Sequence, residues 1–139
     1  MVKVLASGVF DILHPGHLYY LTEARKLGDY LVVVVASDCT ATALKRPPLH
    51  SAEQRAELVR ALKVVDEVII GFDTFDALAM LHQIQPQIIA LGFDQERLEG
   101  ELAGLIADSG QEIDLIRIPR CPSGSVSTSQ YFSDISEVL

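Results

Sequence analysis

Short apolar runs alternate with amphipathic segments along the whole chain. The apolar runs are rich in β-branched residues and fall at residues 3–7, 30–36, 68–70, 87–91 and 113–118, a pattern typical of strands buried on both faces of a sheet. Helical spacing of apolar positions is found at residues 16–27, 51–62, 74–84, 96–109 and 127–138. This alternation predicts an α/β fold, a Rossmann-like, doubly wound parallel five-stranded sheet with helices on both faces.

Local signals mark the ends of the predicted helices. Residues 51–54 read Ser-Ala-Glu-Gln, in which Ser51 can accept a backbone N–H at a helix start. Pro86 lies just beyond the predicted helix 74–84, and Gly110 directly follows the helix 96–109. The final helix would be entered through a polar loop at 121–126.

Length and composition limit the class of protein. A chain of 139 residues with 49% apolar and 22% charged residues predicts one compact domain over residues 1–139. The formal net charge of -8 argues against non-specific binding to nucleic acid or to an anionic membrane. No apolar run is long enough to span a bilayer, and Cys39 and Cys121 are too far apart for a local metal knuckle. We therefore expect a cytoplasmic protein that meets anionic ligands with a local cluster of cations.

The strongest candidate for chemistry lies where the first strand passes into the first helix. The segment 8–17 reads Gly-Val-Phe-Asp-Ile-Leu-His-Pro-Gly-His, which sets His14 and His17 at a helix N-terminus. Unpaired backbone N–H groups and the positive end of the helix dipole favour a phosphate there. Both imidazoles can donate to phosphate oxygens and stabilise the charge that develops at a phosphorus under attack, and Gly16 lets a phosphate come close.

Two other interpretations of this histidine pair are a solvent-exposed turn and a zinc site. An exposed turn carrying two histidines is the commoner meaning of an isolated short motif, but the position between strand and helix favours phosphate. A zinc site would have only Asp11, His14 and His17 as near ligands, with no Cys/His pair elsewhere. The sequence therefore predicts no metal site built by the protein alone.

The stretch GVFDILHPGH resembles the motif of the HxGH nucleotidyltransferases, in particular their cytidylyltransferase-like branch. Further similar stretches follow in the family's order: KLGDYLVVVVASD, HSAEQR, VDEVIIG, IIALGFDQ and PRCPSGSVSTS. The resemblance covers nearly the whole chain. It implies an enzyme in which an acceptor phosphate attacks a nucleoside triphosphate in line, pyrophosphate leaves, and no covalent enzyme intermediate forms.

The resemblance also implies roles for individual residues. His14 and His17 would bind the triphosphate and stabilise the transition state at the α-phosphorus, while Lys45 and Arg55 would hold the β- and γ-phosphates. The other nucleotide-binding positions are Gly8, Val9, Phe10, Gly92, Asp94, Ser127, Thr128 and Ser129. Further contacts to phosphate or acceptor are expected from Asp11, Arg46 and Arg120. Mg²⁺ or another divalent cation would enter bound to the triphosphate.

Several of these positions also have a purely structural interpretation. Lys45 and Arg46 precede two prolines, and a loop exposed to solvent without any ligand also explains these two cations. Arg55 is also explained by an ion pair with a Glu of its own helix. Asp11 is equally well explained as an acid that supports the fold, and Asp94 as a turn former.

Within the family the chain most resembles the archaeal-type FAD synthases, through DILHPGH, residues 90–95 and the late Cys121-Pro122. This implies transfer of AMP from ATP to FMN, giving FAD and pyrophosphate, by a homodimer. The alternative is a cytidylyltransferase that moves CMP from CTP to glycerol 3-phosphate or another phosphoalcohol. A catalytically idle nucleotide-binding module is a third interpretation, against which the intact histidine pair argues.

The chain departs from the family pattern at two positions, and its acceptor site matches no motif. Val9 stands where many members carry Thr, and Gln130 where many carry a cation, which leaves Arg120 as the nearest substitute. Leu44, Phe72 and Phe93 are candidates to line a flavin, although apolar residues at strand ends often belong to the core.

Overall fold

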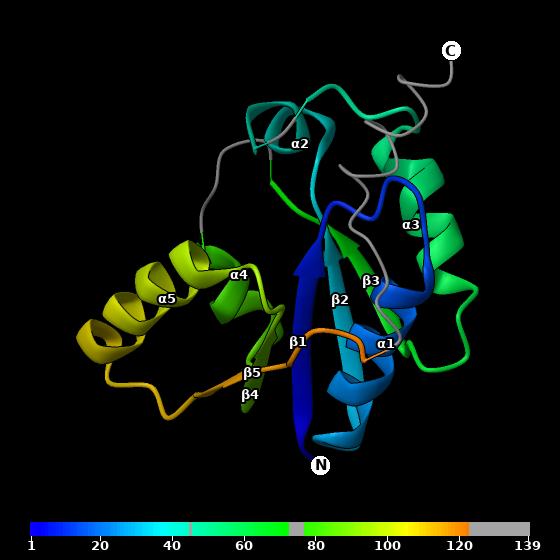
Figure 1. Ribbon diagram of the computed structural model, residues 1–139. Coiled ribbons are helices and arrows are strands. Elements are labelled where there is room, and N and C mark those ends of the chain that lie inside the picture. Colours follow the sequence, from blue (N-terminus) through cyan, green and yellow to red (C-terminus); the bar gives the residue numbers. More distant parts are fainter. Residues whose placement is uncertain (45, 73–76, 123–139) are drawn as a thin grey trace.

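The computed structural model describes residues 1–44, 46–72 and 77–122, and this part of the chain forms a five-stranded parallel sheet flanked by helices (Figure 1). The strands are β1 (Lys3–Gly8), β2 (Tyr30–Val35), β3 (Glu67–Ile70), β4 (Ile88–Leu91) and β5 (Asp114–Arg117). The helices are α1 (Pro15–Lys26), α2 (Asp38–Leu44), α3 (Ala52–Arg60), α4 (Ala77–Ile84) and α5 (Glu96–Ser109). The predicted fold class is confirmed.

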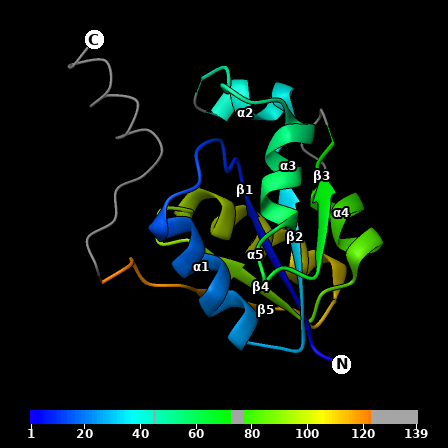
Figure 2. The ribbon, with the colours of Figure 1, turned by 90° about the vertical axis from the view of Figure 1, so that its right-hand side faces the viewer.

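Helices cover both faces of the sheet, α1 and α3 on one and α4 and α5 on the other (Figures 1 and 2). Side chains alternate accordingly along each strand. Val4 and Ala6 of β1 join the apolar cluster under α1 and α3, whereas Leu5 joins the cluster under α4 and α5. Because both faces are buried, the strands read as continuous apolar runs instead of alternating ones.

The strand order is β3-β2-β1-β4-β5, so the direction of winding reverses between β1 and β4. β1 pairs with β2 along its whole length, from Lys3 to Gly8, but with β4 only at Val4 and Leu5. The two central strands therefore separate toward their carboxyl ends. In open parallel sheets, ligands bind in the crevice at this point of reversal.

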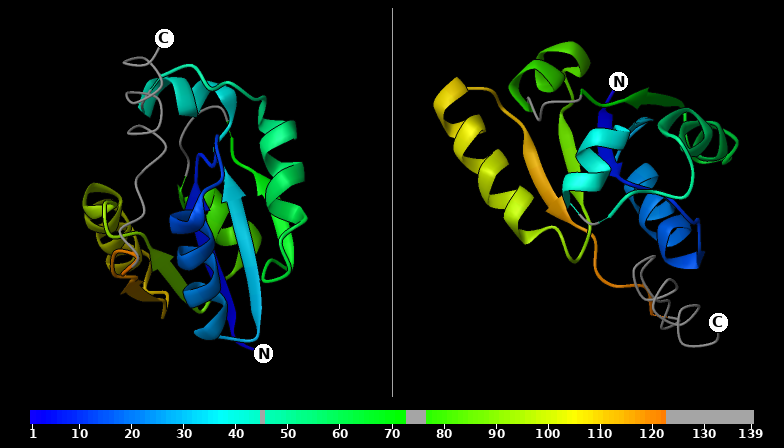
Figure 3. Two further views of the ribbon diagram at one scale, coloured as in Figure 1. Left: turned by 45° about the vertical axis from the view of Figure 1, so that its right-hand side comes forward. Right: turned by 90° about the horizontal axis from the view of Figure 1, so that it is seen from above.

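The main difference from the sequence prediction is α2, which was not expected. The helix is short, its sequence DCTATAL lacks apolar helical spacing, and its start is fixed by Ser37, whose Oγ accepts the Thr40 N–H at 3.1 Å. It lies over the carboxyl ends of the strands (Figure 3). The helix predicted at 127–138 lies outside the described residues. Within the described part of the chain, each helix is too short or too polar to cross a membrane.

Candidate active site

A cavity of about 780 Å³ opens at the carboxyl edge of the sheet. The right-hand view of Figure 3 shows the backbone of this edge from above. The walls of the cavity come from the ends of β1, β2 and β4 and from α1, α2, α4 and α5. This volume lies within the range of roughly 300–1,000 Å³ that small-molecule sites occupy.

The two histidines of the HPGH segment line this cavity. His14 is the N-cap of α1, and its Nδ1 accepts the Gly16 N–H at 3.0 Å. Because Nδ1 is an acceptor, the neutral ring carries its proton on Nε2. The His14 and His17 rings stack with centroids 3.9 Å apart, and the Phe10 ring meets His17 edge-on at 5.3 Å. Packing thus holds both imidazoles in one orientation at the positive end of a helix.

The expectation of unpaired N–H groups at this helix start is wrong. Gly16 donates to the His14 side chain, and the N–H groups of His17 and Leu18 both donate to the His14 carbonyl, at 3.0 and 3.2 Å. Pro15 has no N–H. The hydrogen bonds that α1 offers to a phosphate therefore come from the imidazoles.

The turn before HPGH depends on close packing between Gly8 and Phe10. Phe10 has a φ of 54°, a left-handed conformation rare for a bulky residue, and is only 3% exposed. A Cβ at Gly8 would lie 2.8 Å from Cζ of the Phe10 ring. Gly8 is required here because the ring occupies the space of a side chain.

Two side chains bridge β1 and β4 where the strands separate. The Tyr20 hydroxyl donates to the Ala90 carbonyl at 2.6 Å and accepts the Ser7 N–H at 3.3 Å. Gln95 accepts the Gly92 N–H at 2.7 Å and donates to the Ser7 carbonyl at 3.3 Å. Burial raises the pKa of Tyr20 far above its usual value, so the phenol stays a donor at neutral pH. Neither Tyr20 nor Gln95 is among the site residues expected from the sequence.

Removing the Tyr20 hydroxyl is expected to destabilise the fold. Tyr20→Phe leaves the Ala90 carbonyl and the Ser7 N–H without this partner inside the protein, which costs about 1–3 kcal/mol. Urea denaturation measures this change. The matched control is Tyr30→Phe, because the Tyr30 hydroxyl donates to Glu67 at the exposed surface. Equal losses in the two variants would contradict a specific role of Tyr20.

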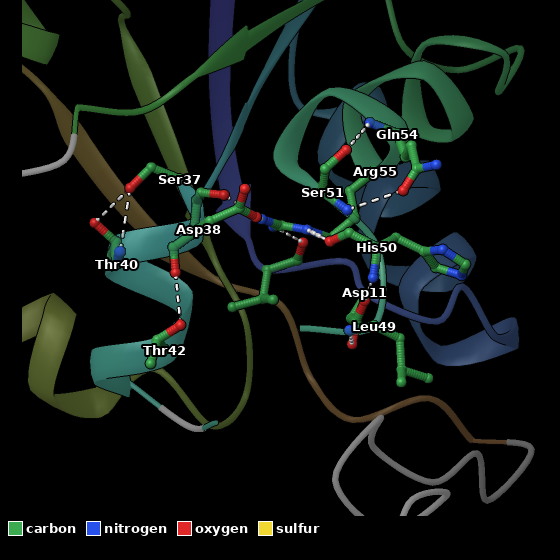
Figure 4. Close-up of polar contacts among 12 residues, drawn as sticks. Asp11, Ser37, Asp38, Thr40, Thr42, Leu49, His50, Ser51, Gln54 and Arg55 are labelled. Carbon is green, nitrogen blue, oxygen red and sulfur yellow. Dashed lines mark hydrogen bonds and ion pairs between the residues drawn. The ribbon is translucent and has the colours of Figure 1, made fainter. Parts of the chain in front are cut away.

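Asp11 supports the fold. Its carboxylate is 4% exposed and accepts the N–H groups of Leu49 and His50 at 2.9 and 3.0 Å (Figure 4). These bonds hold the chain that leads into α3. Asp11 also lines the cavity, but both of its oxygens accept backbone N–H groups, which favours the structural interpretation; its contact with phosphate or acceptor stays a prediction.

We expect Asp11→Asn to lower stability by about 1–3 kcal/mol, because the amide NH₂ would face a backbone donor. Asp29→Asn is the control, since Asp29 accepts one exposed N–H, from Val2. Thermal unfolding with and without ATP distinguishes the two roles. If the Asp11→Asn protein is as stable as the parent but no longer gains stability from ATP, the result would support a direct contact between Asp11 and the ligand.

Arg55 does not line the cavity and is fully buried. Its Nε donates to the His50 carbonyl at 3.0 Å, and Nη1 donates to the Val9 and Ala36 carbonyls, each at 2.8 Å. Nη2 forms an ion pair with Asp38 at 2.8 Å (Figure 4). The guanidinium thus connects three loops, which favours a structural role, and the expected contact of Arg55 with β- and γ-phosphates stays a prediction.

Cations and aromatic rings line other parts of the cavity wall. Arg46 and Arg120 both contribute to it, and the Arg120 guanidinium lies 5.6 Å from the centroid of the Phe93 ring. Arg97, which the sequence analysis did not single out, also lines the cavity and pairs with Glu101 at 3.4 Å. The cavity wall therefore carries three arginines and also three acidic side chains, Asp11, Asp94 and Glu101.

Comparison with known proteins agrees with this arrangement. The sequence model of the family described as "Cytidylyltransferase-like" matches residues 5–131. The chain belongs to the cytidylyltransferase-like family. The expected membership of the nucleotidyltransferases is thereby confirmed, and the HPGH segment lies within the matched region.

Individual members of the cytidylyltransferase-like family are similar over most of their length. A FAD synthase from Methanoculleus marisnigri is 44% identical over 135 residues, which are 97% of this chain and 89% of the relative. A FAD synthase from Picrophilus torridus is 39% identical over 137 residues, 99% of this chain and 98% of the relative. The crystal structure of a protein from Thermoplasma volcanium GSS1, titled a lipopolysaccharide core biosynthesis protein, superposes with a TM-score of 0.82 at 44% identity, covering 87% of this chain and 98% of that one.

Most positions expected from the family resemblance meet at this one cavity. Those that line it are Gly8, Val9, Phe10, Asp11, His14, His17, Arg46, Gly92, Asp94 and Arg120. Lys45, Ser127, Thr128 and Ser129 lie outside the described residues. Leu44, Phe72 and Phe93 also line the cavity, and their exposed fractions of 66%, 44% and 45% exclude the alternative that they are core residues.

Proposed function

We propose that the protein transfers AMP from ATP to FMN, giving FAD and pyrophosphate. The observation that carries this proposal is the stacked His14–His17 pair at the start of α1, which faces a cavity large enough for small-molecule ligands. It is supported by FAD synthases 44% and 39% identical over nearly the whole chain.

In the proposed reaction a phosphate oxygen of FMN attacks the α-phosphorus of ATP, and the bond from that phosphorus to the β-phosphate oxygen breaks. Negative charge grows on the α-phosphate oxygens as this happens. The imidazole of His14, oriented by the bond from Gly16 to Nδ1, donates to one of them. His17 supplies a second donor, and the dipole of α1 favours the same charge. Positioning and charge provide the catalysis, so no residue has to act as nucleophile.

A divalent cation, Mg²⁺ or a similar ion, is part of this proposal as the partner of ATP. Among the residues that the structure describes, no three His, Cys, Asp or Glu side chains come together as a metal site. Asp94 nevertheless places a carboxylate on the cavity wall. One carboxylate together with substrate phosphates is a usual environment for Mg²⁺, so the residues present fit an ion brought in by the nucleotide. When bound, the ion would neutralise phosphate charge.

The test is pyrophosphate release with Mg²⁺ present, with ATP or CTP each combined with FMN or glycerol 3-phosphate. We expect pyrophosphate release only in the combination of ATP with FMN. Release only with CTP and glycerol 3-phosphate would replace the proposal by the cytidylyltransferase alternative. No release, together with tight nucleotide binding, would favour the idle module.

The same proposal includes a cytoplasmic homodimer that binds neither nucleic acid nor membrane. The net charge of -8 supports the expectation that the protein binds neither nucleic acid nor an anionic membrane. Light scattering of the purified protein would test the dimer, because it distinguishes the mass of one chain from that of two.

A further inference from the structure

One part of the cavity differs in chemistry from the rest. Its lining comes from α4, from α5 and from the strands beneath them. These two helices cover the face of the sheet opposite α1 (Figures 1 and 2). We call this part the apolar recess; its walls are Leu5, Val34 and Ile89 from the strands and Met80, Leu81 and Leu102 from the helices. All six belong to the apolar cluster on that face or pack against it. None of these side chains offers an N–H, O–H or carbonyl group.

The chemistry of the recess restricts what can enter it. Adenine and cytosine carry ring nitrogens, amino groups or carbonyls around their edges, and glycerol 3-phosphate is polar throughout. Burying such groups against aliphatic side chains removes their hydrogen bonds to water without replacement. The isoalloxazine ring of FMN is different, because one of its ends is a dimethylbenzene without polar atoms.

We infer that the apolar recess binds the dimethylbenzene end of the FMN ring, with the ribityl phosphate extending toward His14 and His17. This inference rests on the proposed function and names the residues that would select its acceptor. It also accounts for Leu44 and Phe72, which are 66% and 44% exposed on the wall of the same cavity. A flat ring seated in the recess gives these apolar side chains a surface to pack against.

The test uses Met80→Gln, which keeps the length and helix preference of the side chain and adds an amide to the recess. FMN binding is measured without ATP through quenching of flavin fluorescence, and the KM values for FMN and ATP are measured separately. The Kd and KM for FMN are expected to rise about tenfold, because Met80→Gln leaves one buried polar group without a hydrogen-bond partner. The KM for ATP should stay within about twofold of the parent value. The control is Leu78→Gln, on the same helix but 38% exposed and outside the cavity lining.

Equal FMN affinity in the Met80 and Leu78 variants would overturn the inference, and so would a rise in the KM for ATP instead of FMN. If Met80→Gln unfolds, Val34→Thr gives the same test, because it preserves shape and strand preference while adding one hydroxyl to the recess. Its Kd for FMN should rise several-fold. A parent protein that releases no pyrophosphate from ATP and FMN would defeat the proposed function. Quenching of riboflavin fluorescence by that protein, lost in Met80→Gln, would still support the recess as a flavin-ring site.

Discussion

Replacing His17 by alanine is expected to lower kcat by about 10²-fold or more, the usual cost of removing one donor that acts on the transition state. His17 lines the cavity at the start of α1, stacked on His14 and flanked by Phe10. Its contribution is greatest when charge grows on the α-phosphate, so kcat should fall more than affinity for ATP. Steady-state kinetics of pyrophosphate release measures both.

The control for this prediction is His82→Ala, because His82 lies exposed on α4, outside the cavity lining. Circular dichroism and thermal unfolding should show that both variants keep the fold. A His17→Ala enzyme with the parent's kcat would exclude a transition-state role for this imidazole.

Replacing Arg55 by methionine is expected to lower the free energy of unfolding by about 3 kcal/mol or more, because three main-chain carbonyls lose a buried donor at about 1–3 kcal/mol each. The carbonyls of Val9, Ala36 and His50 would lose their donor, and Asp38 its cation. Asp38 is itself 53% exposed, so water can solvate it. Most of the loss therefore comes from the carbonyls. Urea denaturation measures it.

Arg60→Met provides the comparison, since Arg60 is exposed in the last turn of the same helix α3. Its effect should stay within about 0.5 kcal/mol of the parent. If Arg55→Met proved as stable as Arg60→Met but used ATP poorly, the phosphate-binding role implied by the family resemblance would be supported instead.

The fold could be predicted from sequence because its signals are local. A strand such as YLVVVV, buried on both faces, has no need of polar alternation, and helix ends are marked by Ser51 and Gly110. The HPGH segment was located by the same reasoning, because a helix that follows the carboxyl end of a parallel strand begins at the ligand edge.

The roles of Arg55, Tyr20 and Gln95 depend on contacts between distant parts of the chain. One signal for Arg55 was present, since it lies on the buried side of α3 together with Ala52, Ala56 and Val59. An arginine on an apolar helix face must find partners inside the protein. Nothing comparable marks Tyr20 or Gln95, which bind main-chain atoms 70 and 88 positions away.

The Arg55 network also bears on how such a site evolves. Apart from Asp38, its acceptors are main-chain oxygens, which every residue type supplies. Substitutions at Val9, Ala36 or His50 therefore change the side chains of the ligand-facing loops while the anchors of those loops persist. A fold built in this way can come to use a different acceptor substrate through a few loop substitutions, while the sheet and helices stay the same.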